Sequence, residues 1–354
     1  MLDFSLVYWP NRRAIPRIEK ITVRIGILGA GRIGTAHAAA ISATAGAEFI
    51  AVAEPFDEAA KAMADQYGCD IRTIDEIAAA SDIDGVIICT PTDTHADLIE
   101  QFCKAGKAVF CEKPVDLSIK RVQDCLKVVE ETNGTLMVGF NRRFDPDFNG
   151  VKEAIDAGMI GKVEMVNITS RDPGAPPVEY IERSGGIFRD MTIHDFDVAR
   201  WLLGEEVTEV QAIGSVLVDE EIGKVGDYDS VNVLLKTASG RQASITNSRR
   251  ATYGYDQRIE VLGSEGMAQA ENHHEDTVQI ATADGYKRRP LMNFFMERYM
   301  PAYQAEIRAF VAAVEQGITP PTTGEDGLMA LVLAEAAVRS AAEGRMVKVS
   351  EVLA

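Results

Sequence analysis

The sequence predicts an α/β domain followed by an α+β domain: a doubly wound parallel sheet over residues 21–141, and a large, mostly antiparallel open sheet over residues 142–354. Two observations support this prediction. From residue 23 to residue 140, short apolar runs alternate with segments of helical periodicity, as in parallel strands joined by crossover helices. Beyond residue 163, apolar runs follow one another with turn residues between several of them, which is typical of antiparallel strands.

The composition is that of a globular chain with room for two domains. Its 354 residues are long for one hydrophobic core, and 46% of them are hydrophobic without a run of apolar residues long enough to span a membrane. The net charge of -18 repels nucleic-acid phosphates and anionic lipid surfaces, so we expect neither as a partner. Five cysteines without a CxxC pair predict reduced thiols and a cytoplasmic location.

Residues 1–20 precede the first predicted strand and contain the pair Arg12-Arg13. A twin-arginine export signal needs an apolar stretch of about 7 to 15 residues after the arginines. The sequence Ala-Ile-Pro-Arg-Ile-Glu-Lys follows instead. We therefore expect a flexible N-terminal arm, with a surface or subunit-contact role as the alternative.

A glycine-rich turn follows the first strand, which covers residues 23–28. It reads Gly29-Ala30-Gly31-Arg32-Ile33-Gly34, the GxGxxG pattern, and leads into a helix. The first glycine permits a tight turn, the second lets backbone approach a pyrophosphate, and the third lets helix pack on strand. The second strand ends at Glu54, 20 residues beyond Gly34, where a carboxylate binds ribose and repels a 2′-phosphate. These features predict a Rossmann domain that binds NAD through Gly29, Gly31, Arg32, Ile33, Gly34 and Glu54.

The strand over residues 85–89 ends in Thr90-Pro91-Thr92-Asp93-Thr94-His95. Ligands of such sheets lie beyond the carboxyl ends of the strands, so Thr90, Pro91 and His95 are candidates for lining the nicotinamide half of the cofactor site. A capping or packing role is an equal alternative for His95.

The strand over residues 108–111 leads into Glu112-Lys113-Pro114. Proline disfavours a helical conformation for the residue before it, so Lys113 lies at a strand end beside the same crevice. We assign Glu112 to the cofactor site and Lys113 to the chemistry.

Two arginines, Arg142 and Arg143, follow the last strand of the predicted parallel sheet. Either could bind substrate or cofactor, or could pair with carboxylates at the domain junction. We favour the binding role for Arg142 and leave both roles open for Arg143.

The second domain contains one helix among its predicted strands, which cover residues 163–171, 207–218, 231–237, 242–247, 257–262 and 277–281. This helix runs from Gly185 to a glycine stop at Gly204. Asp190, His194 and Asp197 are spaced to form one stripe along it, as in the wall of an active site. The alternative is structural, with Asp190 at a helix N-terminus, solvated aspartates and a hydrogen-bonded histidine. His273-His274 read as an exposed turn, so we predict no metal site.

The glycine turn, Glu112-Lys113-Pro114, the segment 185–197 and Tyr253-Gly254-Tyr255-Asp256 together resemble the glucose-fructose oxidoreductase and inositol dehydrogenase (Gfo/Idh/MocA) family. The resemblance covers the chain from about residue 23 to its end. It implies an NAD-dependent dehydrogenase of a cyclitol, with myo-inositol as the expected substrate and scyllo-inositol, chiro-inositol or glucose as alternatives. It also implies a homotetramer built through sheet faces.

Within this resemblance, Lys113, Asp190 and His194 are the implied catalytic residues. The implied polyol contacts are Arg142, Asp172, Asp197 and Tyr255. Some inositol dehydrogenases carry a histidine just before the arginine of Ser170-Arg171-Asp172, and this chain does not, which leaves the stereochemistry of the polyol open.

The chemistry of alcohol oxidation favours His194 as the base. Hydride leaves carbon as a proton leaves oxygen, so a base is needed beside the nicotinamide. A nearby Lys113 ammonium would keep His194 neutral and stabilise the developing alkoxide, and Asp190 would orient Lys113 or the hydroxyl. A non-catalytic NAD-sensing protein of the same fold is the alternative.

Overall fold

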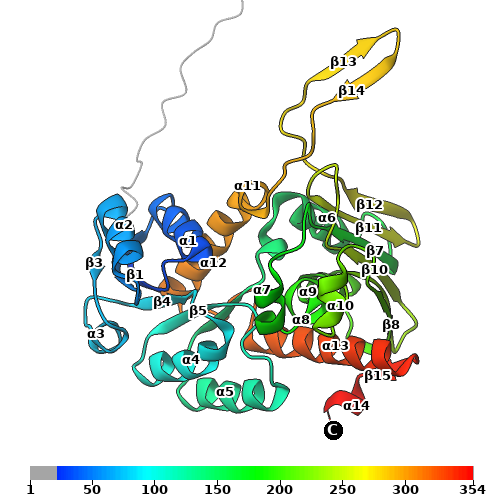
Figure 1. Cartoon of the computed structure of the whole chain (residues 1–354). Coiled ribbons are helices and arrows are strands. Elements are labelled where there is room, and N and C mark those ends of the chain that lie inside the picture. Colours follow the sequence, from blue (N-terminus) through cyan, green and yellow to red (C-terminus); the bar gives the residue numbers. More distant parts are fainter. Residues whose placement is uncertain (1–21, 354) are drawn as a thin grey trace, which may run out of the picture.

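The computed structural model describes residues 22–353. The arm that we expect over residues 1–20 lies outside the described residues. Figure 1 shows two sheets side by side, one in the blue and cyan part of the chain and one in the green and yellow part, with long C-terminal helices between and beneath them.

The first sheet is parallel and has the strand order β3-β2-β1-β4-β5-β6, the arrangement of a Rossmann domain. Every pairing between its neighbours is parallel. The predicted parallel sheet is therefore confirmed. The strands are β1 (Val23–Leu28), β2 (Ala47–Ala53), β3 (Asp70–Ile71), β4 (Gly85–Ile88), β5 (Ala108–Glu112) and β6 (Leu136–Gly139).

The helices of this part connect the strands, and their starts follow local sequence signals. Thr73 and Glu76 form a capping box at the start of α3, and the hydroxyl of Ser118 accepts a hydrogen bond at the start of α5. The helices are α1 (Arg32–Ser42), α2 (Asp57–Tyr67), α3 (Ile74–Ala79), α4 (His95–Lys104) and α5 (Ile119–Glu131), with short 3-10 turns η1 (Thr92–Thr94) and η2 (Asn141–Phe144).

The second sheet has the order β12-β11-β7-β10-β9-β8-β15 and is mostly antiparallel, as predicted. One pair departs from that pattern, since β7 and β10 run parallel. Along β9, buried and exposed residues alternate, so one face packs on the core and the other faces outward. The strands are β7 (Val163–Arg171), β8 (Val207–Ser215), β9 (Ser230–Thr237), β10 (Gln242–Ser248), β11 (Asp256–Gly263), β12 (Gly266–Ala270) and β15 (Val347–Lys348).

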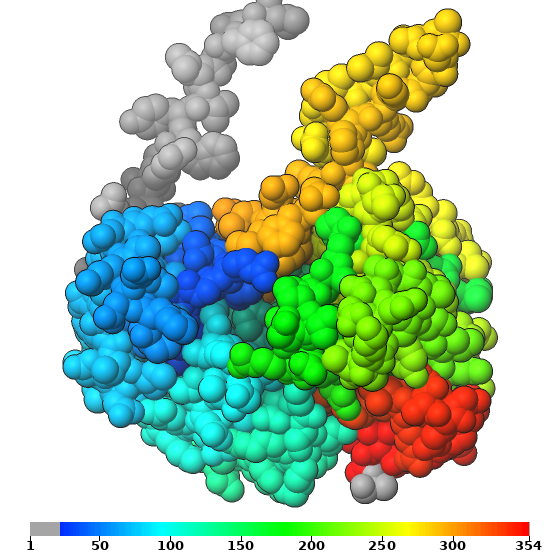
Figure 2. Space-filling view, in the orientation of Figure 1, coloured from blue at the N-terminus to red at the C-terminus, as the bar shows by residue number. Residues whose placement is uncertain are grey.

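The strand that we expected over residues 277–281 is not part of this sheet. It belongs to a separate hairpin of β13 (Gln279–Thr282) and β14 (Gly285–Arg288), which projects from the body in Figures 1 and 2. The Asp284-Gly285 turn makes this hairpin local, so it needs no neighbour from the sheet. Shorter helices complete this part of the chain: α6 (Pro146–Asp156), α7 (Val178–Ser184), α10 (Glu220–Lys224), α11 (Phe295–Arg298) and α14 (Ser350–Leu353).

The single helix that we expected from residue 185 is wrong. The structure has α7, then α8 (Ile187–Asp190), then α9 (Thr192–Leu203), with Met191 between α8 and α9. Gly185 and Gly186 both have positive φ, 83° and 84°, which ends α7 and redirects the chain. Asp227 accepts hydrogen bonds from the backbone N–H of Ile187 and so holds the start of α8.

The two long C-terminal helices connect the sheets. Helix α12 (Met300–Gln316) returns to the first sheet and shares a hydrophobic core with α1 and strands β1, β4 and β5. Helix α13 (Gly324–Glu343) packs in the other core, which continues from the first sheet into the second. Residues on either side of the predicted 141/142 boundary therefore share both cores. None of the helices between residues 22 and 353 is long and apolar enough to cross a membrane.

Candidate active site

The glycine turn has the geometry that a dinucleotide pyrophosphate requires. Gly29 has φ +99°, a conformation that favours glycine. A Cβ on Gly34 would lie 2.0 Å from the carbonyl oxygen of Gly29, so α1 approaches the turn only because this residue lacks a side chain. Gly31 is exposed and has open space around it at the N-terminus of α1. Arg32, which is exposed, and Ile33, which is half-buried, follow it in the first turn of that helix. These residues fit NAD.

Glu54 follows β2 and lies beside the glycine turn. Its carboxylate accepts hydrogen bonds from the backbone N–H groups of Ala30, at 2.6 Å, and Phe56, at 3.0 Å. The carboxylate is therefore held at the position where the sequence places a ribose-binding group.

The loop after β4 is braced from within. The hydroxyls of Thr90 and Thr94 are 2.6 Å apart, and Pro91 is exposed. His95 is 2% exposed, and its two ring nitrogens lie 2.8 Å and 2.7 Å from the carbonyl oxygens of Pro114 and Thr90. These two contacts to backbone fit the packing role that the sequence left open for His95. It ties the end of β4 to the segment after Lys113.

Lys113 and Asp190 come together although they are 77 residues apart in the chain. The Lys113 ammonium donates to the backbone carbonyl of Asp190 at 2.9 Å and lies 3.5 Å from Oδ1 of its carboxylate. The two side chains are 15% and 13% exposed. The pair is therefore largely shielded from water and still reachable. In Figure 2 the surface is hollowed where the blue and cyan part of the chain meets the green segment.

The break between α8 and α9 explains this contact. In one continuous helix, the Asp190 carbonyl would accept the backbone N–H of His194. That N–H instead bonds to the carbonyl of Met191, at 3.3 Å. The Asp190 carbonyl is thereby left for Lys113, so the break creates the bond between the two parts of the chain.

His194 lies at the first turn of α9 and is half-buried. Burial lowers the pKa of its imidazole well below 6.5, and the charges of Lys113 and Arg142 lower the pKa further. The imidazole is therefore neutral at pH 7. Its Nδ1 atom is buried and has no hydrogen-bond partner among the described residues. A neutral imidazole has a lone pair that can accept a proton.

Two further residues contact Asp190, and our sequence analysis missed both. The hydroxyl of Tyr180 donates to Asp190 Oδ1 at 3.0 Å. Arg249 is 1% exposed, and its Nη1 lies 3.6 Å from Asp190 Oδ2. Arg249 follows β10, whose parallel pairing with β7 brings it near Asp172. That pairing was not predictable in a sheet that otherwise reads as antiparallel.

Asp172 and Tyr255, two of the expected polyol contacts, belong to the same charged neighbourhood. Burial raises the pKa of Asp172 to about 6; Asp190 and Asp195 add to the rise, while Arg249 and Arg142 oppose it. Burial also raises the pKa of Tyr255 well above 10, so its hydroxyl keeps its proton. Asp172 therefore titrates close to neutral pH, which is unusual for an aspartate.

The guanidinium of Arg142 is buried and hydrogen-bonds to two protein side chains. It donates to Asp195 and, at 3.1 Å, to the hydroxyl of Ser170. Asp195 is 0% exposed and also accepts from the amide of Asn247 at 2.8 Å. These bonds tie the end of the first sheet to α9 and β10, and they keep a positive charge close to His194.

Asp197 differs from our expectation. It is 1% exposed, and its two oxygens accept from the guanidinium of Arg143, with one bond of 2.8 Å. Arg143 also donates to Asp326 at the start of α13. A buried, bidentate pair with Arg143 favours a role for Asp197 at the junction of the elements. For Arg143 the structure therefore favours the junction role.

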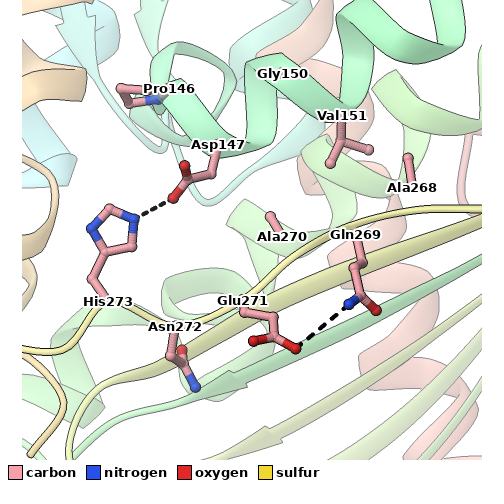
Figure 3. Close-up of a pocket in the computed structure, with 10 residues that line it drawn as sticks. All are labelled: Pro146, Asp147, Gly150, Val151, Ala268, Gln269, Ala270, Glu271, Asn272 and His273. Atoms are coloured by element: carbon pink, nitrogen blue, oxygen red, sulfur yellow. Dashed lines mark hydrogen bonds and ion pairs between the residues drawn. The ribbon is translucent and has the colours of Figure 1, made fainter. Parts of the chain in front are cut away.

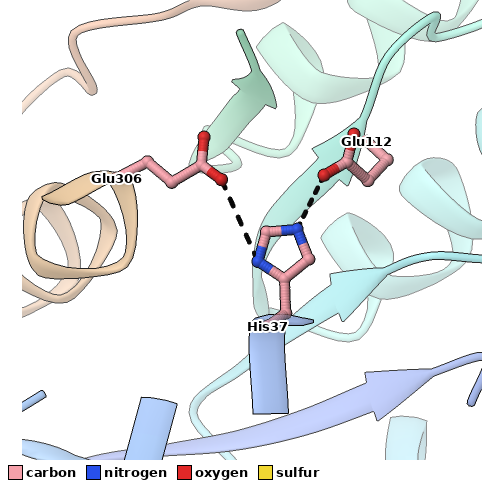
Figure 4. A group of neighbouring side chains, drawn as sticks. All are labelled: His37, Glu112 and Glu306. Carbon is pink, nitrogen blue, oxygen red and sulfur yellow. Dashed lines mark hydrogen bonds and ion pairs between the residues drawn. The ribbon is translucent and has the colours of Figure 1, made fainter. Parts of the chain in front are cut away.

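Glu112 faces a cluster that the sequence did not reveal. His37 of α1 lies between Glu112 of β5 and Glu306 of α12 (Figure 4). His37 Nε2 is 2.6 Å from Glu112 Oε1, and Nδ1 is 4.0 Å from Glu306 Oε1. The three groups offer ligand atoms within 4.8 Å of one another, whereas His273 and His274 belong to no such cluster among residues 22–353.

A groove between α6 and β12 contains none of the predicted site residues (Figure 3). His273 pairs there with Asp147, and His274 bonds to the carbonyl of Arg289. Asp147 and the Arg289 carbonyl thus fix the two histidines at the base of the β13–β14 hairpin.

Comparison with known proteins defines the class. Residues 23–140 match the oxidoreductase family described as NAD-binding Rossmann fold, and residues 152–349 match that family's C-terminal alpha/beta domain. The chain therefore belongs to the Gfo/Idh/MocA oxidoreductase family and carries its NAD-binding domain. The resemblance in sequence and the cofactor prediction are confirmed.

Individual relatives are inositol dehydrogenases. The chain is 64% identical to the inositol 2-dehydrogenase of Rhizobium meliloti (strain 1021), over 93% of this chain and all of that protein. It is 46% identical to the myo-inositol 2-dehydrogenase of Thermotoga maritima, over 94% of this chain and all of that protein. A crystal structure of scyllo-inositol dehydrogenase from Lactobacillus casei, with bound NAD(H) and scyllo-inositol, aligns with a TM-score of 0.86 at 31% identity, over 93% and 99% of the two chains.

Proposed function

We propose that the chain is an NAD-dependent inositol 2-dehydrogenase that oxidises the axial hydroxyl of myo-inositol to the 2-keto product. The observation that carries the proposal is the meeting of Lys113, Asp190 and a neutral His194 beside the NAD-binding edge of the first sheet. The high identity to inositol 2-dehydrogenases of two other organisms supports the choice of substrate.

In this reaction His194 takes the hydroxyl proton. Burial and the neighbouring cations keep the imidazole unprotonated, so it has a lone pair available at neutral pH. NAD, when bound, supplies the acceptor for the hydride. The Lys113 ammonium stabilises negative charge on the substrate oxygen as the proton leaves. Asp190 holds Lys113 through its carbonyl and carboxylate.

Asp172 and Tyr255 are the residues that we propose as polyol contacts. Asp172 accepts from sugar hydroxyls when ionised, and the Tyr255 hydroxyl, which keeps its proton, donates or accepts. Arg142 acts without touching the polyol. It holds Asp195 and adds positive charge beside His194. The cofactor is held by the glycine turn, Glu54, Thr90 and Pro91. Glu112 lies near its nicotinamide end.

A second candidate substrate is scyllo-inositol, which differs in the orientation of one hydroxyl. The fold of this chain superposes on a scyllo-inositol dehydrogenase that was crystallised with that compound. The lower identity of that pair, 31%, makes it the weaker candidate.

We also propose a cytoplasmic homotetramer that assembles through the second sheet. Large apolar side chains are exposed on the outward face of β7, β8, β9, β11 and β12: Met165, Ile213, Leu234, Leu262 and Met267. An exposed apolar face of this kind is stable in water when a second copy covers it. All five cysteines are free, in keeping with a reducing compartment.

Reduction of NAD measured with a panel of polyols tests the proposal. The panel contains myo-inositol, scyllo-inositol, D-chiro-inositol and glucose, each with NAD and with NADP. We expect the highest kcat/KM for myo-inositol with NAD. Tight NAD binding without turnover of any polyol would instead identify an NAD-sensing protein of this fold.

A further inference from the structure

Arg249 is one of the largest side chains that are fully buried among residues 22–353, and its guanidinium lies close to two carboxylates. Nη1 is 3.6 Å from Asp190 Oδ2, and Nη2 is 3.8 Å from Asp227 Oδ2. Nε and Nη2 have no hydrogen-bond partner in the described part of the chain. Burying a charge costs free energy, so a buried guanidinium that is bonded to neither carboxylate calls for an explanation.

Three acidic side chains from distant parts of the chain come close to this guanidinium. Asp190 is the last residue of α8, and Asp227 lies before β9. Asp172 and Arg249 directly follow β7 and β10, which pair in parallel up to their last residues. The backbone N–H of Asp172 also donates to the carbonyl of Ser248, at 2.9 Å. The parallel pairing therefore places Asp172 beside Arg249.

Arg249 is the cation that these acidic groups share. Within residues 22–353, no other lysine or arginine lies within 4.0 Å of Asp227, and Lys113 is the other cation within that distance of Asp190. Burial raises the pKa of Asp172 to about 6, and Arg249 is the largest influence that lowers it. Charge interactions act over such distances, whereas hydrogen bonds need contacts of about 3 Å. The guanidinium therefore acts on the three groups through its charge.

An arginine that only holds the structure together has a different geometry. Arg143 donates two hydrogen bonds to Asp197, one of them 2.8 Å long. Arg249 makes no such bond to a carboxylate of the described chain. The carboxylate of Asp227 is instead engaged by the backbone N–H of Ile187, at 3.0 Å and 3.1 Å. The start of α8 is thus held by another bond, and the charge of Arg249 remains available to the site.

We propose that Arg249 is a positioning residue of the reaction: its charge holds the carboxylates of Asp172 and Asp190 at the site without touching the polyol. Asp190 in turn holds Lys113 through its carbonyl and carboxylate, and Asp172 is the proposed polyol contact. This role rests on the proposed oxidation of a polyol, and it identifies the charge that keeps Asp172 ionised at neutral pH.

Loss of the Arg249 charge changes the pH dependence in one direction. Asp172 is ionised above its pKa of about 6, and without Arg249 that pKa is higher. An ionised Asp172 accepts hydrogen bonds from polyol hydroxyls, so polyol oxidation then needs a higher pH. The other charged and titratable groups that act on Asp172, or on which it acts, are the same with and without Arg249: Arg142, Asp190, Asp195 and Tyr255.

The pH profile of kcat/KM for myo-inositol with saturating NAD tests this role. Arg249→Gln and Arg249→Met remove the charge, and both should move the acid limb of the profile upward by about one pH unit, the size of one charge contact. Arg249→Lys keeps the charge and should retain most of the wild-type profile. If Arg249→Met does not fold, the Gln and Lys variants still decide the question.

Arg250→Met is the matched control. Arg250 follows Arg249 in the chain, is exposed and donates to the carbonyl of Leu217 at 3.0 Å. This variant loses the same charge one residue away from the acidic groups, on the outside of the molecule. Its acid limb should stay at the wild-type pH.

Urea unfolding as a function of pH gives a readout that needs no turnover. The contribution of Asp172 to the free energy of unfolding is lost as pH rises through its folded pKa, about 6 in the wild type. In Arg249→Gln this loss should occur about one pH unit higher, and Asp172→Asn should remove it with or without the Arg249 charge. A lower free energy of unfolding at every pH without such a shift is the result for a purely structural arginine, and would contradict the proposal.

Three kinetic results would overturn the role of Arg249. They are an acid limb that stays at its wild-type pH in Arg249→Gln and Arg249→Met, a limb that moves equally in Arg249→Lys, and a limb that moves equally in Arg250→Met. Lack of turnover of any polyol by the wild type would contradict the proposed function instead. The unfolding profiles of the wild type and Arg249→Gln would then decide whether Arg249 controls the charge of Asp172.

Discussion

Two aspartates of the α8–α9 segment, Asp190 and Asp197, are in opposite situations. Asp190 is reachable, and its carboxylate accepts one hydrogen bond from Tyr180 and lies 3.5 Å and 3.6 Å from Lys113 and Arg249. Asp197 is 1% exposed and is held by both arms of Arg143. His194 lies between them in the chain, and its Nδ1 has no hydrogen-bond partner among residues 22–353.

The difference distinguishes residues that take part in the reaction from residues that hold the fold together. Groups that must bind substrate and move protons keep part of their hydrogen-bonding capacity unused, whereas groups that fix the junction use all of it. Both kinds read alike in the sequence, as aspartates near a histidine. The following substitutions test whether Asp190 and His194 act in the reaction while Asp197 acts in stability.

The largest effect is expected for His194→Ala. Loss of the base should lower kcat by about a thousandfold, within the range for general base catalysis. The Kd for NAD should change less than twofold, because His194 lies outside the glycine turn. Steady-state kinetics and NAD titration measure the two quantities. Turnover close to that of the wild type would remove His194 as the base.

Asp197→Asn should act on stability. The change removes one of the two carboxylates that pair with the buried Arg143 charge and leaves Asp326 as the other, so we expect a loss of about 1 to 3 kcal/mol. Urea unfolding measures this loss, and kcat per folded molecule should stay within about twofold of the wild type. The mirror variant, Asp190→Asn, should lower kcat and leave the unfolding free energy nearly unchanged. The reverse pattern in the two variants would show that the roles assigned to Asp190 and Asp197 are wrong.

Asp172→Asn tests the pH dependence. The folded pKa of Asp172, about 6, exceeds its ordinary value of 3.8, so the native state binds more protons between these two values. This carboxyl therefore favours the folded state at low pH, and that contribution is lost as pH rises through about 6. Asn should remove this pH dependence from urea unfolding and raise the KM for myo-inositol several-fold. An unchanged KM would exclude Asp172 as a polyol contact.

Tyr180→Phe should have the smallest effect. It removes a hydrogen bond to Asp190 from an exposed side chain, worth about 1 kcal/mol or a fivefold loss in kcat/KM. Tyr253→Phe, which removes a hydroxyl bonded to Asp256 and Arg171, is the control. Equal losses in both variants would argue against a specific role for Tyr180.

Much of the fold was predictable because the local signals agree with one another. The glycine turn, the position of Glu54 and the alternation of strands with helices all indicate the same domain, and the six-stranded parallel sheet follows. The second sheet was predictable as mostly antiparallel. Its parallel β7–β10 pair and its hairpin of β13 and β14 were not, because strand pairing depends on contacts distant in sequence.

The site was less predictable, for physical reasons that concern particular residues. Helical spacing suggested that Asp190 and Asp197 share a stripe, but the break at Met191, between α8 and α9, separates them. Arg249 and Tyr180 carry no motif and reach Asp190 only through the fold. The cluster around His37 joins α1, β5 and α12, and only the return of α12 to the first sheet brings Glu306 there.

The central claim is that His194 is neutral and free to take a proton, and nitrogen NMR of the imidazole tests it most directly. The chain has five histidines, so comparison of the wild type with His194→Ala identifies the signal of His194. The structure predicts a neutral imidazole at pH 6.5, because the pKa lies well below that value. An imidazolium signal at pH 6.5 that disappears in His194→Ala would contradict the account.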